Sequence, residues 1–458
     1  MQIQIELNPG QLLPKIDTFV EMAVSRVIAV HDRWDHKRGS PVITVKGEYT
    51  SRSWTDWTLG FFIGQALLLF DLTDDSRLLT LGRERTYTWM PAHISHMGVH
   101  DHGFNIVSTY GNLRRLFLED RIAANGSELE LCELALKLSG AVQAARYQTT
   151  NIGKGYIYSF NGPHSLFVDT IRSMRSLVLS HHLGHYLLGE AEQRVNLFQR
   201  ALEHAETTAR FNVYLGEGRD IYDVPGRVAH ESIFNIHDGQ YRCPSSQQGY
   251  SSFSTWTRGA GWVMLGFAEL LEYFPLAADE EFERFGGRQT LLKRFQQVLQ
   301  VTCDYYIDGY TCKDGIPFWD TGAPGLKYLS DYQNADSDPH NAFEPVDSSA
   351  AAITAQGLIR FGNYLENHGD EDTGRRYITA GLTVAGTLFS DPYLSRNPNH
   401  EGLILHSVYH HPRGFDQIPE GRKIPCGESS LWGDYHALEL ALLIKRMAEG
   451  DYLTFFAR

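Results

Sequence analysis

Positive charge is scarce in this sequence. Its 41 Lys and Arg residues stand against 55 Asp and Glu residues, so the 458-residue chain has a formal net charge of -14. Nucleic acids and anionic membranes are bound through basic surfaces, and this balance excludes both as expected partners. No stretch approaches the ~20 consecutive apolar residues that span a bilayer. A small acidic ligand remains compatible if local Arg, His or backbone N–H groups bind it.

Cysteine and nucleotide-binding motifs are also sparse. The five cysteines are scattered and form no CxxC pair, so neither a disulfide framework nor a zinc cage is expected. HExxH, P-loop, GxSxG and Rossmann patterns are also absent. The first residues, "MQIQIELNPG", lack the basic and apolar regions of a signal peptide, so the expected location is cytoplasmic.

Apolar residues recur with helical spacing through most of the chain. The pattern predicts about twelve helices, at 14–34, 57–70, 76–91, 103–118, 127–146, 166–188, 191–210, 254–274, 288–307, 347–366, 372–389 and 429–448.

Helix polarity separates these segments into two layers. Residues 347–366 are rich in small side chains and suit an inner layer, whereas 76–91 and 191–210 are more polar and suit an outer layer. Residues 211–253 and 308–346 form long loops, and the first contains a predicted short β-hairpin around Asp238-Gly239. We therefore predict an all-α (α/α)6 barrel, a toroid of helical hairpins, as one catalytic domain over 1–458. An α-solenoid is the alternative, but no sequence repeat supports it.

The stretch "HDHGFN" places His100 and His102 on either side of Asp101. A metal site is disfavoured because two histidines two residues apart are poorly placed on one face of a helix and no third ligand is near. Asp101 is a suitable N-cap for the helix that follows. It also suits a catalytic carboxylate held by imidazoles. The motif alone leaves these interpretations open.

A second carboxylate, Asp169, lies in the apolar stretch "HSLFVDTIRSMRS". An unpaired ionised carboxylate there would be costly. We expect a raised pKa, as a general acid needs, or an Arg partner such as Arg172, or exposure at a helix end. A plain helix cap is an equally good interpretation.

Residues suited to binding a sugar acid occur in "QQGYSSFSTWTRGAGW". Arg258 and Trp262 are four residues apart and share a helix face, and Gln248 precedes them. An indole can stack on a sugar ring while a guanidinium binds its carboxylate. Arg–Trp pairs also occur as ordinary packing.

Together the segments "DWTLGFF", "HDHGFN", "VDTIRSMRS", "RVAHES", "TWTRGAGW", "PFWDTGAPG", "DSSAAA" and "LWGDYHALE" resemble, in the same order, the unsaturated glucuronyl hydrolases of glycoside hydrolase family 88. The resemblance extends over most of the chain. It implies an (α/α)6 barrel without cofactor. It also implies hydration of the C4=C5 double bond that polysaccharide lyases leave in a terminal uronic acid.

The resemblance further implies roles for individual residues. Asp169 matches the general acid/base and Asp101 the supporting carboxylate. The residues that match substrate-binding positions are His100, His230, Gln248, Arg258, Trp262, Trp57 and, in place of a family Trp, Phe160. The implied partner is an unsaturated uronic-acid oligosaccharide.

Several alternatives remain at this stage. They are an unsaturated rhamnogalacturonyl hydrolase, an ordinary inverting glycosidase using Asp101 and Asp169, and a non-catalytic sugar-binding toroid. The family's usual acidic pair before "STW" is replaced by Ser252 and Phe253, and the segment 410–427 also departs from the family's pattern. The natural lyase product, the tolerance of sulfate and the oligomeric state are therefore open.

Overall fold

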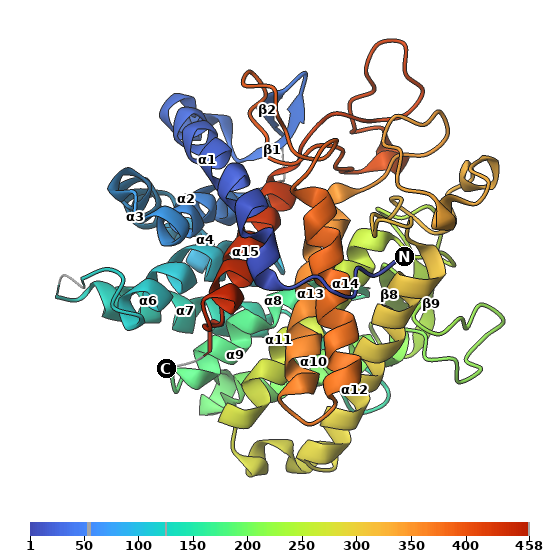
Figure 1. Ribbon diagram of the computed structural model, residues 1–458. Coiled ribbons are helices and arrows are strands. Elements are labelled where there is room, and N and C mark those ends of the chain that lie inside the picture. The colour runs from blue at the N-terminus through green and yellow to red at the C-terminus, as the bar shows by residue number, and fades with distance from the viewer. Residues whose placement is uncertain (53–55, 124–125, 457–458) are drawn as a thin grey trace.

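The computed structural model describes residues 1–52, 56–123 and 126–456. Helices dominate it (Figure 1). The α-helices are α1 Pro9–Arg33, α2 Leu59–Thr73, α3 Ser76–Trp89, α4 Pro91–Ile94, α5 His102–Asn105, α6 Asn112–Leu118, α7 Glu128–Ala145, α8 Thr170–Ser173, α9 Arg175–His182, α10 Leu197–Phe211, α11 Thr257–Tyr273, α12 Arg288–Asp304, α13 Ser348–Glu366, α14 Glu371–Leu388 and α15 Leu431–Ala448.

An inner ring is built from the most apolar of these helices. Nearly every residue of α2, α11, α13 and α15 is buried. Neighbours contact in the order α2, α5, α8, α11, α13, α15 and back to α2, which closes the ring. Figure 1 shows α13 and α15 side by side within it.

The remaining long helices form the outer layer. Helices α1, α3, α7, α10, α12 and α14 each precede an inner segment, so outer and inner helices alternate along the chain. On α3 only Leu78, Gly82 and Thr86 are buried, as expected for an outer helix. In contrast α10 is buried over most of its surface, where strand β4 contacts it. The alternating layers confirm the predicted (α/α)6 barrel.

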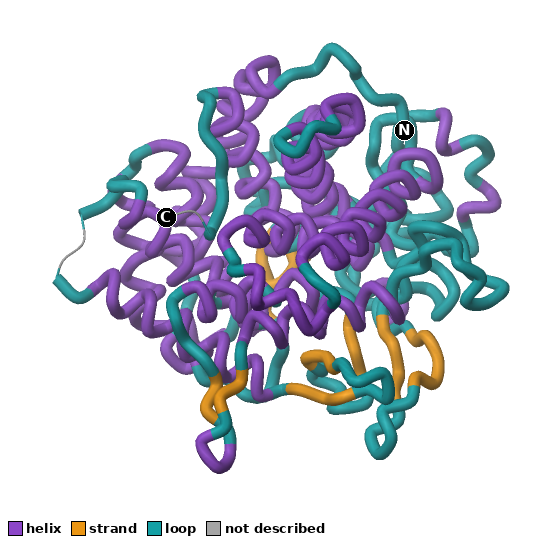
Figure 2. The backbone as a smooth tube through the Cα atoms, turned by 90° about the horizontal axis from the view of Figure 1, so that it is seen from below, coloured by secondary structure: helices purple, strands orange, loops and turns teal. Residues whose placement is uncertain are grey.

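Short strands are attached to this barrel, most of them on one side (Figure 2). They are β1 Pro41–Val45, β2 Glu48–Ser51, β3 Tyr147–Thr149, β4 Gly155–Ile157, β5 Ser165–Phe167, β6 Leu187–Leu188, β7 Arg194–Val195, β8 Glu231–Phe234 and β9 Tyr241–Ser245. The predicted hairpin is confirmed as β8–β9, and β5 adds to it in the order β5-β8-β9.

The predicted helix 166–188 is wrong at its start. Residues Ser165–Phe167 pair with β8 as a strand, and the helical part is divided into α8 and α9 at Met174. The apolar run "SLFV" suits a strand as well as a helix, and its pairing partner lies far along the chain.

Glycine permits direct backbone contact within the inner ring. A Cβ on Gly103 of α5 would come within 2.5 Å of Ser173 Cα, and one on Gly266 of α11 within 2.8 Å of Arg172 N. Any larger residue would therefore force α5 or α11 away from α8.

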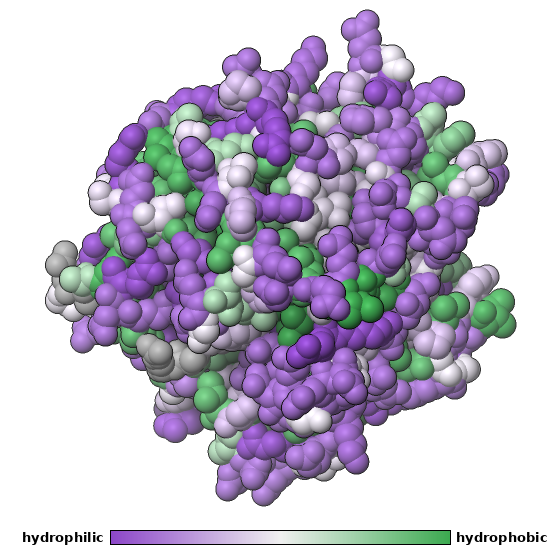
Figure 3. Space-filling view, in the orientation of Figure 1, coloured by the Kyte–Doolittle hydropathy of each residue, from purple (hydrophilic) through white to green (hydrophobic). Residues whose placement is uncertain are grey.

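The outer surface is mostly polar. The face drawn in Figure 3 is largely hydrophilic, with apolar residues scattered over it. None of the described helices is long and apolar enough to cross a membrane.

Candidate active site

The two predicted carboxylates occupy equivalent positions at neighbouring helices of the inner ring. Asp101 is the N-cap residue of α5, and Asp169 is the N-cap residue of α8. Neither side chain makes the capping hydrogen bond that this position usually provides. The plain helix-cap interpretation is therefore incomplete for both, because each carboxylate points to other partners.

His100 lies between the two carboxylates. Its Nε2 is 3.6 Å from Asp101 Oδ1 and 3.8 Å from Asp169 Oδ1. The imidazole is buried, whereas the carboxylate side chains keep 10% and 13% of their surface exposed. A ligand can thus reach both carboxylates, while the imidazole stays behind them.

The strand ladder brings His230 to Asp169. Phe167 of β5 pairs with Glu231 of β8, and Val168 N–H donates to the His230 carbonyl at 2.9 Å. The ring Nδ1 of His230 accepts a hydrogen bond from the Gln247 backbone N–H at 3.0 Å. In the neutral imidazole the proton must then be on Nε2, which has no hydrogen-bond partner among the residues that the structure describes. This N–H is therefore a buried donor that the described residues leave unpaired.

The charges around His100 shift the two carboxyl pKa values in opposite directions. Burial raises the pKa of Asp101, and the charge of Asp169 adds to the rise despite the opposing effect of His100. Burial also tends to raise the pKa of Asp169, but close approach of His100 and the charge of His230 outweigh it, and the pKa lies below its ordinary value. Burial tends to lower the pKa of His100, yet Asp101 and Asp169 raise it overall. In the free protein Asp169 is the ionised group, and Asp101 holds a proton more readily.

The raised pKa and the Arg172 partner that the sequence suggests for Asp169 are therefore both wrong. Arg172 turns away from Asp169 and binds Glu269 and Glu439 in the barrel interior. The partners of Asp169 are imidazoles instead.

Rings connect the other predicted residues into one cluster. Trp57 stacks on Trp432 at a centroid distance of 5.2 Å, and the Arg258 guanidinium lies 4.8 Å from the Trp432 ring and 4.6 Å from that of Trp256. Trp256 in turn meets His230 edge-on at 4.9 Å. The cluster thus runs from Trp57 to the imidazole beside Asp169.

Arg258 is held by acceptors of the protein itself. Its Nη1 lies 3.2 Å from Asp347 Oδ2, and its Nη2 donates to Gln248 Oε1 at 2.9 Å and to the Tyr409 carbonyl at 2.8 Å. The side chain is buried. Arg258 therefore fixes Gln248 and the loop at Tyr409, and a ligand would compete with existing bonds for it.

Trp262 and Phe160 lie at opposite depths. Trp262 is 2% exposed and packs between Phe104 and His436, beneath the carboxylates. Phe160 is 48% exposed, and its ring is nearly parallel to that of His100 at 6.1 Å. Phe160 is exposed enough to contact a ligand, whereas Trp262 can influence a ligand only through the residues that pack on it.

The second histidine of "HDHGFN" points away from the first. His102 Nδ1 bonds Ser139 Oγ at 2.8 Å, and its Nε2 bonds the His96 carbonyl at 2.9 Å. Burial lowers its pKa to about 4. Within residues 1–52, 56–123 and 126–456, no group of three or more His, Cys, Asp or Glu side chains is arranged to hold a metal ion.

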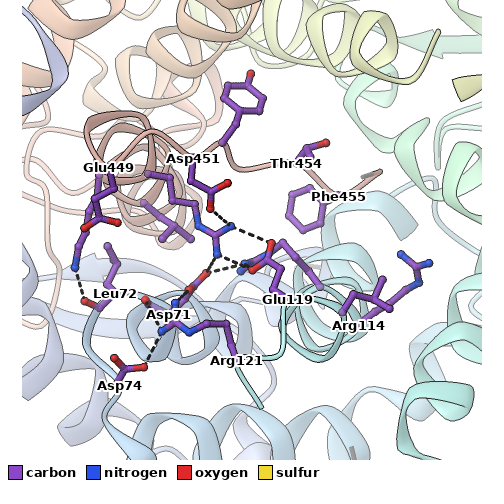
Figure 4. Close-up of a pocket in the computed structure, with 16 residues that line it drawn as sticks. Asp71, Leu72, Asp74, Arg114, Glu119, Arg121, Glu449, Asp451, Thr454 and Phe455 are labelled. Carbon is purple, nitrogen blue, oxygen red and sulfur yellow. Dashed lines mark hydrogen bonds and ion pairs between the residues drawn. The ribbon is translucent and has the colours of Figure 1, made fainter. Parts of the chain in front are cut away.

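A cavity of about 520 Å³ lies at the other end of the barrel (Figure 4). Its walls come from the carboxyl-terminal ends of α2 and α15, from α6 and from the segment after α15. Charged side chains line it, and they are paired with each other. Arg446 bonds Asp71 and Glu119, and Arg115 bonds the same two carboxylates.

Comparison with known proteins shows which proteins this chain is similar to. No protein-family profile matches the chain. A protein named unsaturated glucuronyl hydrolase from Formosa agariphila is 24% identical over 400 residues, which are 84% of this chain and 78% of that protein. The crystal structure of an unsaturated glucuronyl hydrolase specific for heparin superposes with a TM-score of 0.70 at 19% identity, covering 96% of this chain and 99% of that one.

The predicted resemblance is confirmed: this chain is a relative of the unsaturated glucuronyl hydrolases. Another solved structure, a Streptococcus agalactiae unsaturated glucuronyl hydrolase with one Asp replaced by Asn and dGlcA-GalNAc6S bound, superposes with a TM-score of 0.61. That pair is 20% identical over 96% of this chain and 97% of the other.

Three aromatic residues near this site were not among the predicted site residues. Trp256 and Trp432 flank Arg258, and Tyr409 packs on Trp432 at 5.1 Å. The signal for Trp256 and Trp432 was present, because "TWTRGAGW" and "LWGDYHALE" are among the segments that carry the resemblance.

Proposed function

We propose that this protein removes the 4,5-unsaturated uronyl residue from the non-reducing end of lyase-generated oligosaccharides by hydrating its C4=C5 bond. The observation that carries the proposal is the Asp101–His100–Asp169 arrangement, in which one imidazole contacts two carboxylates whose pKa values are shifted apart. Such a separation supplies a proton donor and an ionised carboxylate in one site.

The first step is proton transfer to carbon. Asp169, once protonated, gives its proton to C4, and the C4=C5 electron pair forms the new C–H bond. The ring oxygen then shares the positive charge at C5 as an oxocarbenium ion. An ionised carboxylate beside C5 stabilises this charge.

Water completes the reaction. The Asp169 carboxylate accepts a proton from a water molecule as its oxygen bonds to C5, which gives a hemiketal. The C5–O5 bond of the hemiketal then breaks to form a ketone at C5. The hemiacetal left at C1 releases the remaining sugar as an alcohol, so the net change is addition of one water.

Substrate binding explains how Asp169 acquires its proton. In the free protein His100 and His230 keep its pKa below the ordinary value. A bound uronate brings a further negative charge and excludes water, and both effects raise the pKa of a neighbouring carboxyl. Asp101 and His100, whose pKa values are raised, are the proton reserve beside it.

An ordinary inverting glycosidase is the second candidate. The same pKa pattern favours it, because Asp101 would be the acid and ionised Asp169 the base that activates water. In that mechanism a saturated glucuronide is cleaved and the double bond is not needed.

The decisive experiment compares paired substrates. Unsaturated disaccharides from chondroitin, hyaluronan, heparin, gellan, xanthan and pectin are assayed with the wild-type protein, each beside its saturated counterpart. Loss of the ultraviolet absorbance of the C4=C5 bond, with no turnover of the saturated sugars, is expected. Turnover of the saturated sugars would contradict hydration and support the inverting mechanism, and turnover of pectin products alone would identify a rhamnogalacturonyl hydrolase.

A further inference from the structure

Four buried charged side chains lie in the middle of the barrel, beneath the carboxylates. We call Arg172, Arg175, Glu269 and Glu439 the arginine–glutamate quartet; each is at most 2% exposed. Arg172 Nε and Nη2 donate to the two Glu269 oxygens at 2.8 and 2.9 Å, and Nη2 also donates to Glu439 at 2.9 Å. Arg175 Nη1 lies 3.5 Å from Glu269 and 3.9 Å from Glu439. Two positive and two negative charges balance.

The two arginines connect directly to the helices that begin at the carboxylates. Arg172 is the third residue of α8, whose N-cap is Asp169. Arg175 Nε donates to the Gly103 carbonyl at 3.0 Å, within α5, whose N-cap is Asp101. Each carboxylate thus begins a helical turn that carries or contacts an arginine of the quartet.

The glutamates belong to helices that carry the binding residues. Glu269 is on α11, which begins with Thr257 and Arg258, and Glu439 is on α15, which begins with Leu431 and Trp432. The quartet therefore joins four inner segments of the ring at one point.

His436 adds a bond to the same centre. Its Nδ1 lies 2.6 Å from the Trp432 carbonyl and donates to it, so its Nε2 is the acceptor for Arg172 Nη1 at 2.8 Å. Burial and the charge of Arg172 lower the pKa of His436 to about 3, which keeps the ring neutral. Arg172 is in this way also connected to the backbone at Trp432.

Stability alone does not account for such a cluster. Removing four charges from water offsets most of their mutual attraction, and apolar replacements of buried ion pairs are often as stable. Helices α5 and α8 are the first turns of longer helical stretches, because α5 continues through the π-helical residues Val107–Gly111 into α6 and α8 continues through Met174 into α9. The placement of these first turns in the ring depends on their contacts with neighbouring helices, and the two arginines supply charged ones.

We propose, building on the proposed function, that Arg172 and Arg175 are positioning residues that fix the separation and orientation of Asp101 and Asp169. Neither arginine touches the substrate. Their task is to hold the first turns of two helical stretches so that both carboxylates meet the same imidazole.

The test is a charge-neutral replacement, Arg172→Met with Glu439→Leu, which leaves the Arg175–Glu269 pair in place. The expected result is a folded protein whose kcat falls about 100-fold, the loss typical of a displacement near 1 Å, with KM changed less than threefold. Arg172→Lys keeps the charge but not the paired bonds, and we expect an intermediate kcat. A twofold or smaller loss of kcat in the folded double variant would overturn the proposal.

The matched control lies at the other end of α15. Asp71→Leu with Arg446→Met also removes one buried, charge-neutral pair, and wild-type kcat is expected. An equal loss of kcat in both double variants would mean a general effect of core charges and would also overturn the proposal. If Arg172→Met/Glu439→Leu does not fold, the kcat of Arg172→Lys and the pH profile of that variant test the proposal instead.

A readout independent of turnover separates this proposal from the proposed function. The pKa values of Asp101 and Asp169 are measured by carbon NMR in wild type and in Arg172→Met/Glu439→Leu. The proposal requires that their separation changes, whatever the wild type does to unsaturated sugars. Unchanged carboxyl pKa values overturn it, whereas failure of wild type to consume any unsaturated sugar overturns only the proposed function.

Discussion

Helix α15 connects two ends of the barrel that use charge differently. At its start, around Trp432, the carboxylates Asp101 and Asp169 meet imidazoles rather than guanidinium groups. At its other end, about 21 Å away at 1.5 Å per residue, Arg446 lies among carboxylates. Figure 4 shows Asp71, Glu119 and Asp451 converging there.

The two ends differ in which polar atoms lack a hydrogen-bond partner. All the oxygens of Asp71 and Glu119 accept hydrogen bonds from arginines. At the opposite end four atoms are buried and have no hydrogen-bond partner in the described part of the chain, namely Asp169 Oδ1, both ring nitrogens of His100 and Nε2 of His230. The 520 Å³ cavity thus lies at the end where the carboxylates are satisfied, which we call the satisfied end, and the unpaired carboxylate and imidazole atoms lie in the candidate active site.

The largest difference in kcat between variants at the two ends is expected when one carboxylate is replaced by an amide. Asp169→Asn removes the proposed acid/base, and kcat on an unsaturated disaccharide should fall about 10³-fold. Asp71→Asn makes the same chemical change at the satisfied end and should leave kcat within twofold. Ultraviolet absorbance of the C4=C5 bond measures both. Comparable kcat losses would mean that the comparison is mistaken.

Stability should show the reverse order. Asp71→Ala removes the one acceptor that Arg115, Arg121 and Arg446 have in common, and loss of one partner of a buried ion pair costs about 3–5 kcal/mol. Asp169→Ala should cost less, because no guanidinium depends on it. Denaturant unfolding of both variants measures these free energies. A larger loss for Asp169→Ala would contradict the expectation.

The acid side of the stability curve gives an additional control on Asp71. Burial raises its pKa, but Arg115 and Arg446 outweigh burial and hold the pKa below its ordinary value. Its stabilising contribution is therefore complete above the unfolded-state pKa of about 4 and is lost as the pH falls further. Asp71→Ala should remove this part of the acid destabilisation.

Replacing each imidazole should distinguish the contributions of Asp101 and Asp169 to the pH profile of kcat/KM. His100 lowers the pKa of both Asp101 and Asp169, whereas His230 acts on Asp169. In His100→Gln both carboxyl pKa values rise, and the acidic limb of kcat/KM should move to higher pH by about one unit. His230→Gln should raise the pKa of Asp169 alone and move the limb less. An acidic limb that stays in place in His100→Gln would exclude both carboxyls as its origin.

The smallest expected effect is at the exposed rim of the site. Phe160→Ala removes a ring that a sugar can stack on, and a stacking contact of about 1 kcal/mol corresponds to a rise in KM of about fivefold with little change in kcat. Leu131→Ala on outer helix α7 removes a comparably exposed apolar side chain and should leave KM unchanged. Equal effects would remove Phe160 from the site.

Long periodic segments were predictable because their signal is local. The predictions 347–366 and 429–448 correspond to Ser348–Glu366 and Leu431–Ala448, where apolar spacing and an Asp or Ser cap occur in one stretch. The stretch from Ser165 was not predictable in this way. Its state depends on pairing with Glu231–Phe234, more than sixty residues later, which no local pattern reveals.

The candidate site divides along the same line. Residue types and positions were predictable, since Asp101, His100, Asp169 and His230 are adjacent as expected. Their partners were not. The sequence neighbour Arg172 binds Glu269 and Glu439, 97 and 267 residues away, and the resulting pKa of Asp169 is opposite to that expected from burial alone.

The absent side chains of Gly103 and Gly266 have a consequence for how this protein could acquire a new substrate. The backbones of α5 and α11 touch the backbone of α8 at these glycines, so the helices of the barrel cannot move apart or tilt to admit a bulkier sugar. Evolutionary change in preference must then arise in the connections between helices, such as 211–253, 308–346 and 410–427. The reaction and the choice of oligosaccharide can therefore be altered independently of each other.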